Sequence, residues 1–264
     1  MIHNKIAFYK FHGAGNDFIM INLFGCKINL KASDIALLCD RHLGIGADGL
    51  ITIEPYQDVD FRMIYYNSDG FEGSMCGNGG RSAAAFAFFE KITGAKSEFL
   101  AFDGVHQSIV KQTNKELFDV EITMKNVENW ELTNQSLIVN TGSPHYVLKT
   151  DKLSDFDVFS NGKRIRNDER FGPKGINVNF MELIGDQIHL RTYERGVENE
   201  TLSCGTGVTA AAIAASLWYN KDEVCILTKG GVLEVCLTKS ERGFSDIVLK
   251  GPVEMVFKGE INLK

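Results

Sequence analysis

The chain carries one arrangement twice: a cysteine, a glycine-rich bend and an alanine-rich segment. The copies are SMCGNGGRSAAA at 74–85 and SCGTGVTAAA at 203–212. Aligned without gaps from Cys76 and Cys204, they share the cysteine, two glycines and three alanines. The segments AAAFAFFEKI and AAAIAASLWY have little polar face, which predicts enclosed helices. The repeat therefore predicts two similar halves, each built around one buried helix.

Strand-like and turn-like patterns surround both motifs in the same order. Ser33 is expected to cap a short early helix, and the first alanine-rich helix is expected to end near Gly94. The second is expected to end near Tyr219. Hairpins are predicted to turn at Asp103-Gly104 and near Gly230-Gly231. Alternating apolar residues predict strands in KIAFYKF, DFIMINLF, DGLITIE, VDFRMIYYN, FDVEITMK and SDIVLKG.

These elements predict an α+β fold with two pseudo-symmetric α/β domains. Each domain is a strand-rich, barrel-like sheet that wraps a central helix. The expected domains are 1–126, carrying Cys76, and 127–252, carrying Cys204, and the terminal strand 253–264 is expected to rejoin the first.

Composition narrows the possible partners. Of 264 residues, 44% are hydrophobic and 23% are charged, as in ordinary globular proteins. The net charge of -6 provides no basic field for nucleic acid or an anionic membrane. The sequence shows neither a secretory signal nor a long apolar run, so we expect a cytoplasmic protein that acts on a small molecule.

The six cysteines are scattered, with no C-x-x-C pair and no zinc-site spacing, so no metal is expected. In a reducing compartment, four of them are expected to be small buried thiols. These are Cys26, Cys39, Cys225 and Cys236.

A cysteine at a helix start is placed for chemistry. Helix N-termini lower a thiol pKa from about 8.5 to between about 3.5 and 7.5, and their N–H groups also hold carboxylates. Two such termini in similar halves predict a cleft with one thiol on each face of a ligand. That arrangement suits removal of a proton from one face of a carbon and delivery to the other. The simpler interpretation is that each motif is a helix-starting turn with a packed cysteine.

Nearly the whole chain resembles the diaminopimelate epimerases, which interconvert L,L- and meso-diaminopimelate in lysine and peptidoglycan precursor synthesis. The resemblance rests on FHGAGNDF (11–18), RHLGIGADGL (41–50), YYNSDG (65–70), MCGNGGR (75–81), GSPHYV (142–147), INVNF (176–180), YERG (193–196) and ETLSCGTG (200–207). It implies the two-domain fold, the diaminopimelate substrate, no cofactor and a possible homodimer.

The resemblance also implies roles for individual residues. Cys76 and Cys204 would be the two bases, and His145 and Glu194 would orient them or help to deprotonate them. Around the reacting carboxylate, the implied residues are Gly77, Asn78, Gly205 and Thr206. The other implied substrate-binding residues are Asn16, Asn67, Asn177, Arg195 and Glu194, which would recognise the distal end of the substrate or lie beside the thiols.

Two positions depart from the family pattern. Gly49 stands where many members have glutamine, and Ser143 stands where many have asparagine before Pro-His. We therefore expect no side-chain contact at Gly49 and a shorter or water-bridged contact at Ser143.

Two rival functions remain open. One is a proline-racemase-like enzyme of the same fold, which Asn78 and the run GVENETLSCGTG disfavour. The other is a thiol redox or sensor protein, in which the paired cysteines would oxidise to a disulfide. A related isomerase-like branch lacks the cysteine pair, so the presence of Cys76 and Cys204 argues against it.

Overall fold

The computed structural model describes residues 5–26 and 28–262, which form two compact units. Unit 1 comprises the described residues up to 122 and those from 252 onwards, and unit 2 comprises 123–251. The last strand, β16 (Gly243–Asn262), contributes its first part to unit 2 and its second part to unit 1. In the described residues, no helix combines the length and apolar character needed to span a membrane.

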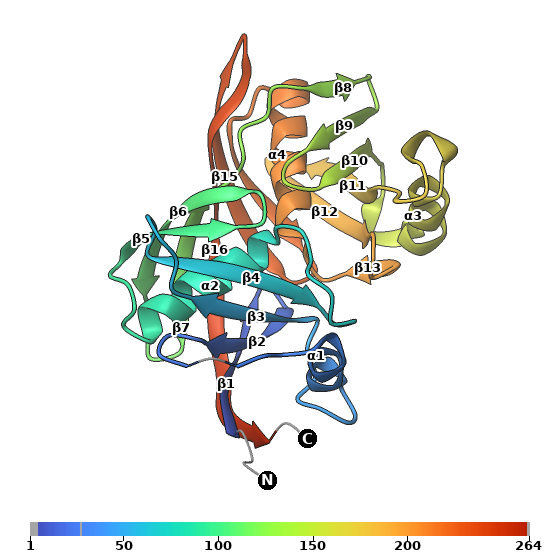
Figure 1. Ribbon diagram of the computed structural model, residues 1–264. Helices are drawn as coiled ribbons and strands as arrows, with labels where there is room; N and C mark the ends of the chain where they lie inside the picture. The colour runs from blue at the N-terminus through green and yellow to red at the C-terminus, as the bar shows by residue number, and fades with distance from the viewer. Residues whose placement is uncertain (1–4, 27, 263–264) are drawn as a thin grey trace. The chain divides into compact units, whose positions relative to one another are not determined.

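The strands of unit 1 form a closed ring around one helix. In order, the neighbouring strands are β1 (Lys5–Gly13), β2 (Asn16–Asn22), β3 (Gly49–Glu54), β4 (Phe61–Asn67), β5 (Lys96–Ala101), β6 (Gly104–Gln112) and β7 (Leu117–Thr123). The second part of β16 lies between β7 and β1 and closes the ring. Inside it lies α2 (Gly77–Phe89), whose residues 77–87 are all buried (Figure 1).

Unit 2 repeats this plan. Its strands are β8 (Trp130–Leu132), β9 (Ser136–Asn140), β10 (Pro144–Lys149), β11 (Asn177–Ile184), β12 (Gln187–Glu194), β14 (Glu223–Thr228) and β15 (Gly231–Ser240), followed by the first part of β16, while β13 (Asn199–Thr201) pairs with β12. Val127 and Phe244 exchange backbone hydrogen bonds of 2.9 and 2.7 Å, linking the segment before β8 to β16. The sheet surrounds α4 (Gly205–Tyr219), whose residues 205–216 are buried.

The strand pairings follow the same order in the two units. In unit 1, β1–β2 and β3–β4 pair antiparallel, and β2–β3 and β4–β5 pair parallel. In unit 2, β9–β10 and β11–β12 pair antiparallel, and β10–β11 and β12–β14 pair parallel. Parallel neighbours need crossover connections. These connections carry α1 (Ala32–Cys39) and α2 in unit 1, and α3 (Val158–Arg166) and α4 in unit 2.

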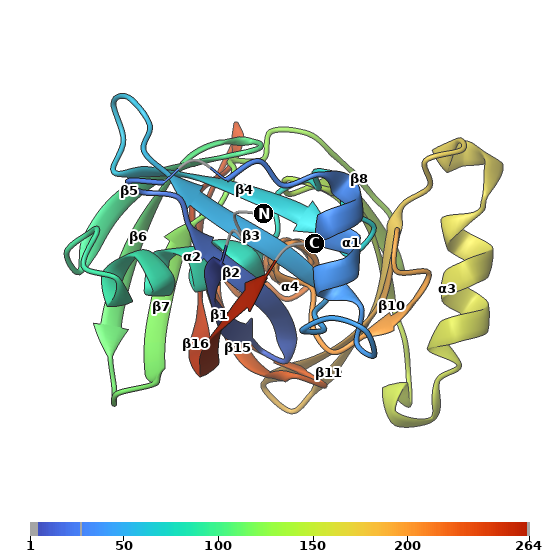
Figure 2. The same cartoon turned by 60° about the horizontal axis from the view of Figure 1, so that its bottom comes forward.

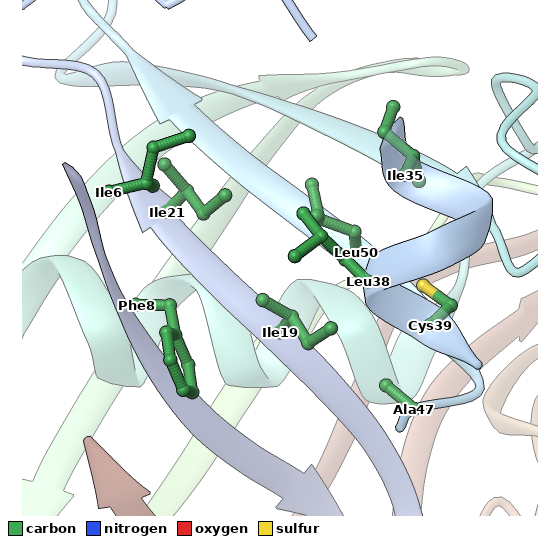
Figure 3. Packing of buried hydrophobic residues seen from close by; sticks show 9 residues of the cluster. All are labelled: Ile6, Phe8, Ile19, Ile21, Ile35, Leu38, Cys39, Ala47 and Leu50. Atoms are coloured by element: carbon green, nitrogen blue, oxygen red, sulfur yellow. The ribbon is translucent and has the colours of Figure 1, made fainter. Parts of the chain in front are cut away.

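The crossover helices α1 and α3 cover the outer faces of their sheets. Figure 3 shows Ile35 and Leu38 of α1 above Ile19 and Leu50 of the sheet, within a larger apolar cluster. Because side chains alternate along β2, the neighbouring Phe18 is buried on the inner face, the side that α2 occupies. In unit 2, α3 lies beside the sheet (Figure 2) and packs against residues of β11 and β12.

Two helix boundaries differ from the sequence predictions. The first helix begins at Ala32, because the Asp34 carboxylate accepts a hydrogen bond from the Lys31 N–H, so Ser33 lies inside the helix and does not cap it. Helix α2 ends at Phe89, well before the predicted end near Gly94. Lys91 adopts a left-handed backbone with φ 59°, which stops the helix before the predicted glycine.

The prediction of four buried thiols is wrong for three of them. Only Cys39 is buried, and Cys26, Cys225 and Cys236 are exposed. Cys225 and Cys236 lie on antiparallel strands whose alternate residues, such as Val224 and Val235, face the core. The pleat therefore turns these two cysteines towards solvent.

Candidate active site

Cys76 occupies the N-cap position of α2. Its backbone is extended, and its Sγ accepts a hydrogen bond of 3.4 Å from the N–H of Gly79. The sulfur therefore takes the place of the oxygen in a conventional cap, facing N–H groups and the positive end of the helix dipole. This environment favours the thiolate.

Asn16, at the start of β2, contacts the N-terminus of α2. Its Nδ2 donates to Asp48 Oδ2 at 2.7 Å, and because a carboxylate only accepts, this bond fixes the amide orientation. Asn16 Oδ1 therefore faces α2, where it lies 3.6 Å from Cys76 Sγ and accepts from Asn78 Nδ2 at 3.4 Å. The structure thus brings together Asn16, Cys76 and Asn78, three of the predicted site residues.

A charged network supports Asn16 from behind. Arg41 pairs with Asp17 and Asp48, each at 2.8 Å, and Lys10 pairs with Asp17 at 2.7 Å. Burial opposes ionisation of Asp17, but the hydrogen bonds from Arg41 and Lys10 outweigh it and hold the pKa of this carboxyl well below its usual range. Asp17, which holds Arg41 beside Asp48, is therefore charged at neutral pH.

Cys204 is the N-cap residue of α4 and is 8% exposed. Its Sγ lies 3.5 Å from Thr206 Oγ1, and either atom can donate in this contact. Thr206 is held by its neighbours, since the Thr141 hydroxyl donates to its carbonyl oxygen at 2.8 Å. A side chain that can both donate and accept therefore lies beside the second thiol.

His145 on β10 is fully buried and holds Thr206. Its Nε2 lies 2.8 Å from Thr206 Oγ1, and its Nδ1 lies 3.0 Å from Asn179 Nδ2. Asn179 Nδ2 also donates to the carbonyl of Tyr146, and Asn179 Oδ1 accepts from Thr192, so the amide orientation is determined. His145 Nδ1 must then accept, which leaves the proton on Nε2, from where it donates to Thr206.

The protonation state of His145 follows from its burial. Desolvation, reinforced by the positive charge of Arg195, lowers the pKa of His145 to about 3. At neutral pH the ring is therefore uncharged and acts through its single N–H. It orients the Thr206 hydroxyl beside Cys204 and carries no charge that would stabilise a thiolate.

The remaining predicted residues of unit 2 lie on neighbouring strand ends. Asn177 Oδ1 accepts from the Arg195 N–H at 2.9 Å, and Asn177 Nδ2 donates to Ser143 Oγ at 2.9 Å. Ser143 therefore orients Asn177 through a direct hydrogen bond. From the sequence we expected only a shorter or water-bridged contact at Ser143 and did not predict this bond. Glu194 Oε2 accepts from the Thr201 hydroxyl at 3.1 Å, which ties the end of β12 to β13.

The departure at Gly49 has a steric reason. Gly49 lies opposite Asn67, the last residue of β4, in the register of the two strands. A Cβ at Gly49 would lie 2.5 Å from the ring of Tyr65 and 2.5 Å from the Tyr66 carbonyl oxygen. Tyr65 thus fills the space that a longer side chain would need, and no side chain fits at Gly49 without moving backbone.

Sequence reasoning missed Asn179, Asp48 and Arg81. Asn179 lies two residues after Asn177 in INVNF, and Asp48 lies in GADG, so both were inside recognised motifs. A polar residue on a strand that is otherwise buried was the available signal for Asn179.

Residues 5–26 and 28–262 contain no group of three or more His, Cys, Asp or Glu side chains that could hold a metal ion.

Comparisons with known proteins cover nearly the whole chain. The diaminopimelate epimerase family model matches residues 8–129 and 137–256. A diaminopimelate epimerase from Flavobacterium psychrophilum is 46% identical over 257 residues, covering 96% of this chain and 99% of the relative. One from Archaeoglobus fulgidus is 38% identical over 279 residues, covering 98% and 97%.

Solved structures share the fold at low identity. A phenazine biosynthesis protein of the PhzF family from Bacillus anthracis superposes with a TM-score of 0.77 at 14% identity, over 98% of this chain and all of that one. A probable proline racemase from Agrobacterium radiobacter superposes with a TM-score of 0.72 at 14% identity, over 98% and 93%. These two likenesses concern the fold, whereas the full-length matches above identify the family. The chain belongs to the diaminopimelate epimerase family.

Proposed function

We propose that the chain interconverts L,L- and meso-diaminopimelate by two-base proton transfer at Cα, with Cys76 and Cys204 as the bases and without a cofactor. The observation that carries the proposal is the pair of N-cap cysteines at equivalent points of two matching folding units. Membership of the diaminopimelate epimerase family supplies the substrate.

In the proposed reaction, the substrate loses one proton and gains one proton. The thiolate of one cysteine removes the α-hydrogen as a proton, and the C–H electron pair stays on the substrate as a carbanion. The thiol of the other cysteine delivers its proton to the opposite face. The configuration inverts, and the two sulfurs exchange protonation states. In the reverse direction their roles exchange.

The helix termini supply the groups that would stabilise the carbanion. The N–H groups at Gly77, Asn78, Gly205 and Thr206 belong to the first turns of α2 and α4, where backbone donors lack partners within the helix. Donors directed at a carboxylate whose negative charge grows in the transition state lower the barrier, and loss of one good donor costs about 2.7–4 kcal/mol. The helix dipoles add to this effect.

The polar residues around each thiol would complete the site. His145 would position Cys204 through Thr206, and Glu194 would lie near the thiols as in the family. Asn16, Asn67, Asn177 and Arg195 would bind the distal amino-acid end, for which a guanidinium suits the carboxylate. We further propose a cytoplasmic homodimer on the strength of the family resemblance, to be checked by light scattering of the purified protein.

Exchange of the α-hydrogen tests the reaction and the substrate together. The reduced protein is incubated in deuterium oxide with L,L-diaminopimelate, proline or lysine and no added cofactor, and deuterium at Cα is followed by NMR. We expect exchange with diaminopimelate only, in the wild type and in Cys225→Ser, which replaces an exposed cysteine. Exchange with proline alone would support a proline racemase, and no exchange would refute the proposal.

Oxidation tests whether the two thiols reach one substrate. A mild oxidant should link Cys76 to Cys204 and abolish exchange, and a reductant should restore both thiols and the rate. The link is identified by mass spectrometry of peptides from the intact chain. Full oxidation that leaves activity unchanged, or inactivation that a reductant cannot reverse, would contradict the proposed pairing.

A further inference from the structure

Arg81 is a buried cation that forms no ion pair with a carboxylate of the described residues. Arg81 belongs to α2, and its side chain is fully buried. Its two terminal nitrogens donate to neutral acceptors, the Gly77 carbonyl at 3.2 Å and Asn78 Oδ1 at 2.9 Å. Its Nε is buried and has no hydrogen-bond partner among the described residues. Buried charges in proteins are normally paired, because an isolated one is costly to desolvate. We therefore expect a negatively charged group close to Arg81 to offset the cost of burying its charge.

The guanidinium lies beside the start of the helix that Cys76 caps. It reaches back one turn to Gly77, the residue after Cys76, and it holds Asn78, whose amide contacts Asn16. Burial lowers the pKa of Arg81 to about 10, and the interaction that opposes this is with Cys76. The sulfur of Cys76 is therefore the group near Arg81 that can carry the missing negative charge.

Unit 2 has no cation at the matching position. The gapless alignment of the two motifs places Thr209 opposite Arg81. Thr209 Oγ1 donates to the Gly205 carbonyl at 3.1 Å, which repeats the bond from Arg81 to Gly77 with a neutral hydroxyl. In unit 2, Thr206 contacts Cys204, and the uncharged His145 donates to Thr206.

We propose that Arg81 is the resident counter-cation of the Cys76 thiolate, so that Cys76 is ionised and Cys204 protonated in the resting protein. The Gly79 N–H supports the same state by donating to the sulfur. Asn16 Oδ1 opposes it as an acceptor, and it is placed to receive the S–H when Cys76 becomes protonated during turnover. Beyond Asn16, the charges of Asp48 and Arg41 pair with each other.

The catalytic meaning of this assignment rests on the proposed function. If Cys76 is the resting thiolate, the substrate-free protein is ready to deprotonate the isomer whose α-hydrogen faces Cys76. The family resemblance makes this the L,L isomer. Thiol ionisation itself is measured without substrate.

The test is the pH dependence of alkylation by iodoacetamide in the intact reduced protein. The rate at each cysteine is measured by peptide mass spectrometry and scaled to its own plateau, so that unequal burial does not affect the midpoint. We expect the Cys76 midpoint at least about one pH unit below that of Cys204. A Cys204 midpoint at or below that of Cys76 would overturn the proposal.

Variants at the matched positions isolate the charge. In Arg81→Met, the scaled Cys76 rate at pH 7 should fall at least about tenfold while the Cys204 midpoint stays, and Arg81→Lys should keep most of the wild-type Cys76 rate. Thr209→Val should move neither midpoint. An unchanged Cys76 midpoint in folded Arg81→Met refutes the role of Arg81. If that variant does not fold, the order of midpoints in the wild type still decides.

The outcomes separate this proposal from the proposed function. Alkylation in the expected order without deuterium exchange refutes the epimerase reaction but keeps the ion pair. Exchange with the reverse order of midpoints refutes the ion pair but keeps the reaction.

Discussion

The N-termini of α2 and α4 have nearly the same backbone and different surroundings. Cys76 has φ −118° and ψ 113°, and Cys204 has φ −126° and ψ 111°. The carbonyl of each accepts an N–H four residues later at 2.8 Å. The backbone geometry that places a sulfur over a helix dipole is therefore duplicated, and any difference in thiol chemistry must come from neighbouring side chains.

Those neighbours differ in charge. Behind Cys76, Asn16 donates to Asp48, which pairs with Arg41, and Arg81 lies within the helix. Beside Cys204 lies the hydroxyl of Thr206, which the neutral ring of His145 holds, and the charge of Arg195 acts on that ring. One half therefore carries a cation within the helix that Cys76 begins, whereas the other contacts its thiol through neutral hydrogen-bonding groups. If the two thiols are the proposed bases on opposite faces of the substrate, they need not have the same resting pKa.

The largest expected effect comes from removing either sulfur. Cys76→Ser and Cys204→Ser should each lower the rate of epimerisation by at least about 10³-fold, because an alcohol is far less acidic than a thiol and positioned proton transfer contributes about 10²–10⁴-fold. Serine retains the N-cap, so the melting temperature should change little. Epimerisation is followed by NMR. A near-normal rate in either variant would show that this half supplies no base.

Loss of the Thr206 hydroxyl should be the next largest effect. Thr206→Val keeps the shape but removes the atom that accepts from His145 and contacts Cys204. We expect the rate to fall about 10²-fold, as for the loss of one well-placed donor, and Thr206→Ser to restore most of it. The Cys204 alkylation midpoint should shift in the valine variant, while that of Cys76 should not. Equal rates in the two variants would mean that the hydroxyl does not act on Cys204.

Two matched glycines test how tightly each half holds its polar network. A Cβ at Gly207 would lie 2.4 Å from Asn179 Oδ1, a short side chain fixed by several hydrogen bonds. At Gly79 the nearest atoms are the methyl ends of Ile51 at 3.1 Å and Met63 at 3.3 Å, which can move.

We therefore expect Gly207→Ala to lower the free energy of unfolding by about 2 kcal/mol, because a close contact with a fixed group costs up to about 3 kcal/mol and the gain in helix propensity offsets about 1 kcal/mol of it. Gly79→Ala should be nearly neutral, because the gain in helix propensity of about 1 kcal/mol offsets its milder contacts. Urea denaturation measures both. Equal losses in the two variants would show that the Asn179 network is no stiffer than the apolar contacts of unit 1.

Local patterns predicted the parts of this fold that depend on neighbouring residues. The enclosed helices followed from the absence of a polar face, and both hairpin turns followed from their glycines. The end of α2 could not be predicted in the same way, because Lys91 terminates it in a conformation that glycine usually adopts. The exposure of Cys225 and Cys236 depended on strand register, which composition does not reveal.

The candidate site shows the same division. The two thiols were identifiable because the motif repeats, and the resemblance supplied the other named residues. The direction of each hydrogen bond was not identifiable, since it depends on residues far apart in the chain. The His145 tautomer, for example, follows from Asn179, which is 34 residues away and is itself oriented by Tyr146 and Thr192.

The last prediction concerns acid stability. Because burial lowers the pKa of His145 to about 3 from an ordinary 6.5, the unfolded chain binds a proton that the folded chain refuses between these values. The stability that depends on neutral His145 is therefore complete above pH 6.5 and decreases as the pH falls towards 3. The limiting slope is about 1.4 kcal/mol per pH unit. Urea denaturation between pH 7 and pH 4 measures it.

His145→Gln isolates this contribution, because a glutamine amide can still donate to Thr206 but does not titrate in this range. The variant should lose less stability per pH unit below pH 6.5 than the wild type. Asp17 responds at lower pH, because its folded pKa lies below the ordinary 3.8 and its stabilising charge is lost only as the pH falls below that value. The network of unit 2 should therefore weaken at a higher pH than the network of unit 1. Parallel stability curves for wild type and His145→Gln would show that the neutral ring is not what makes unit 2 acid-sensitive.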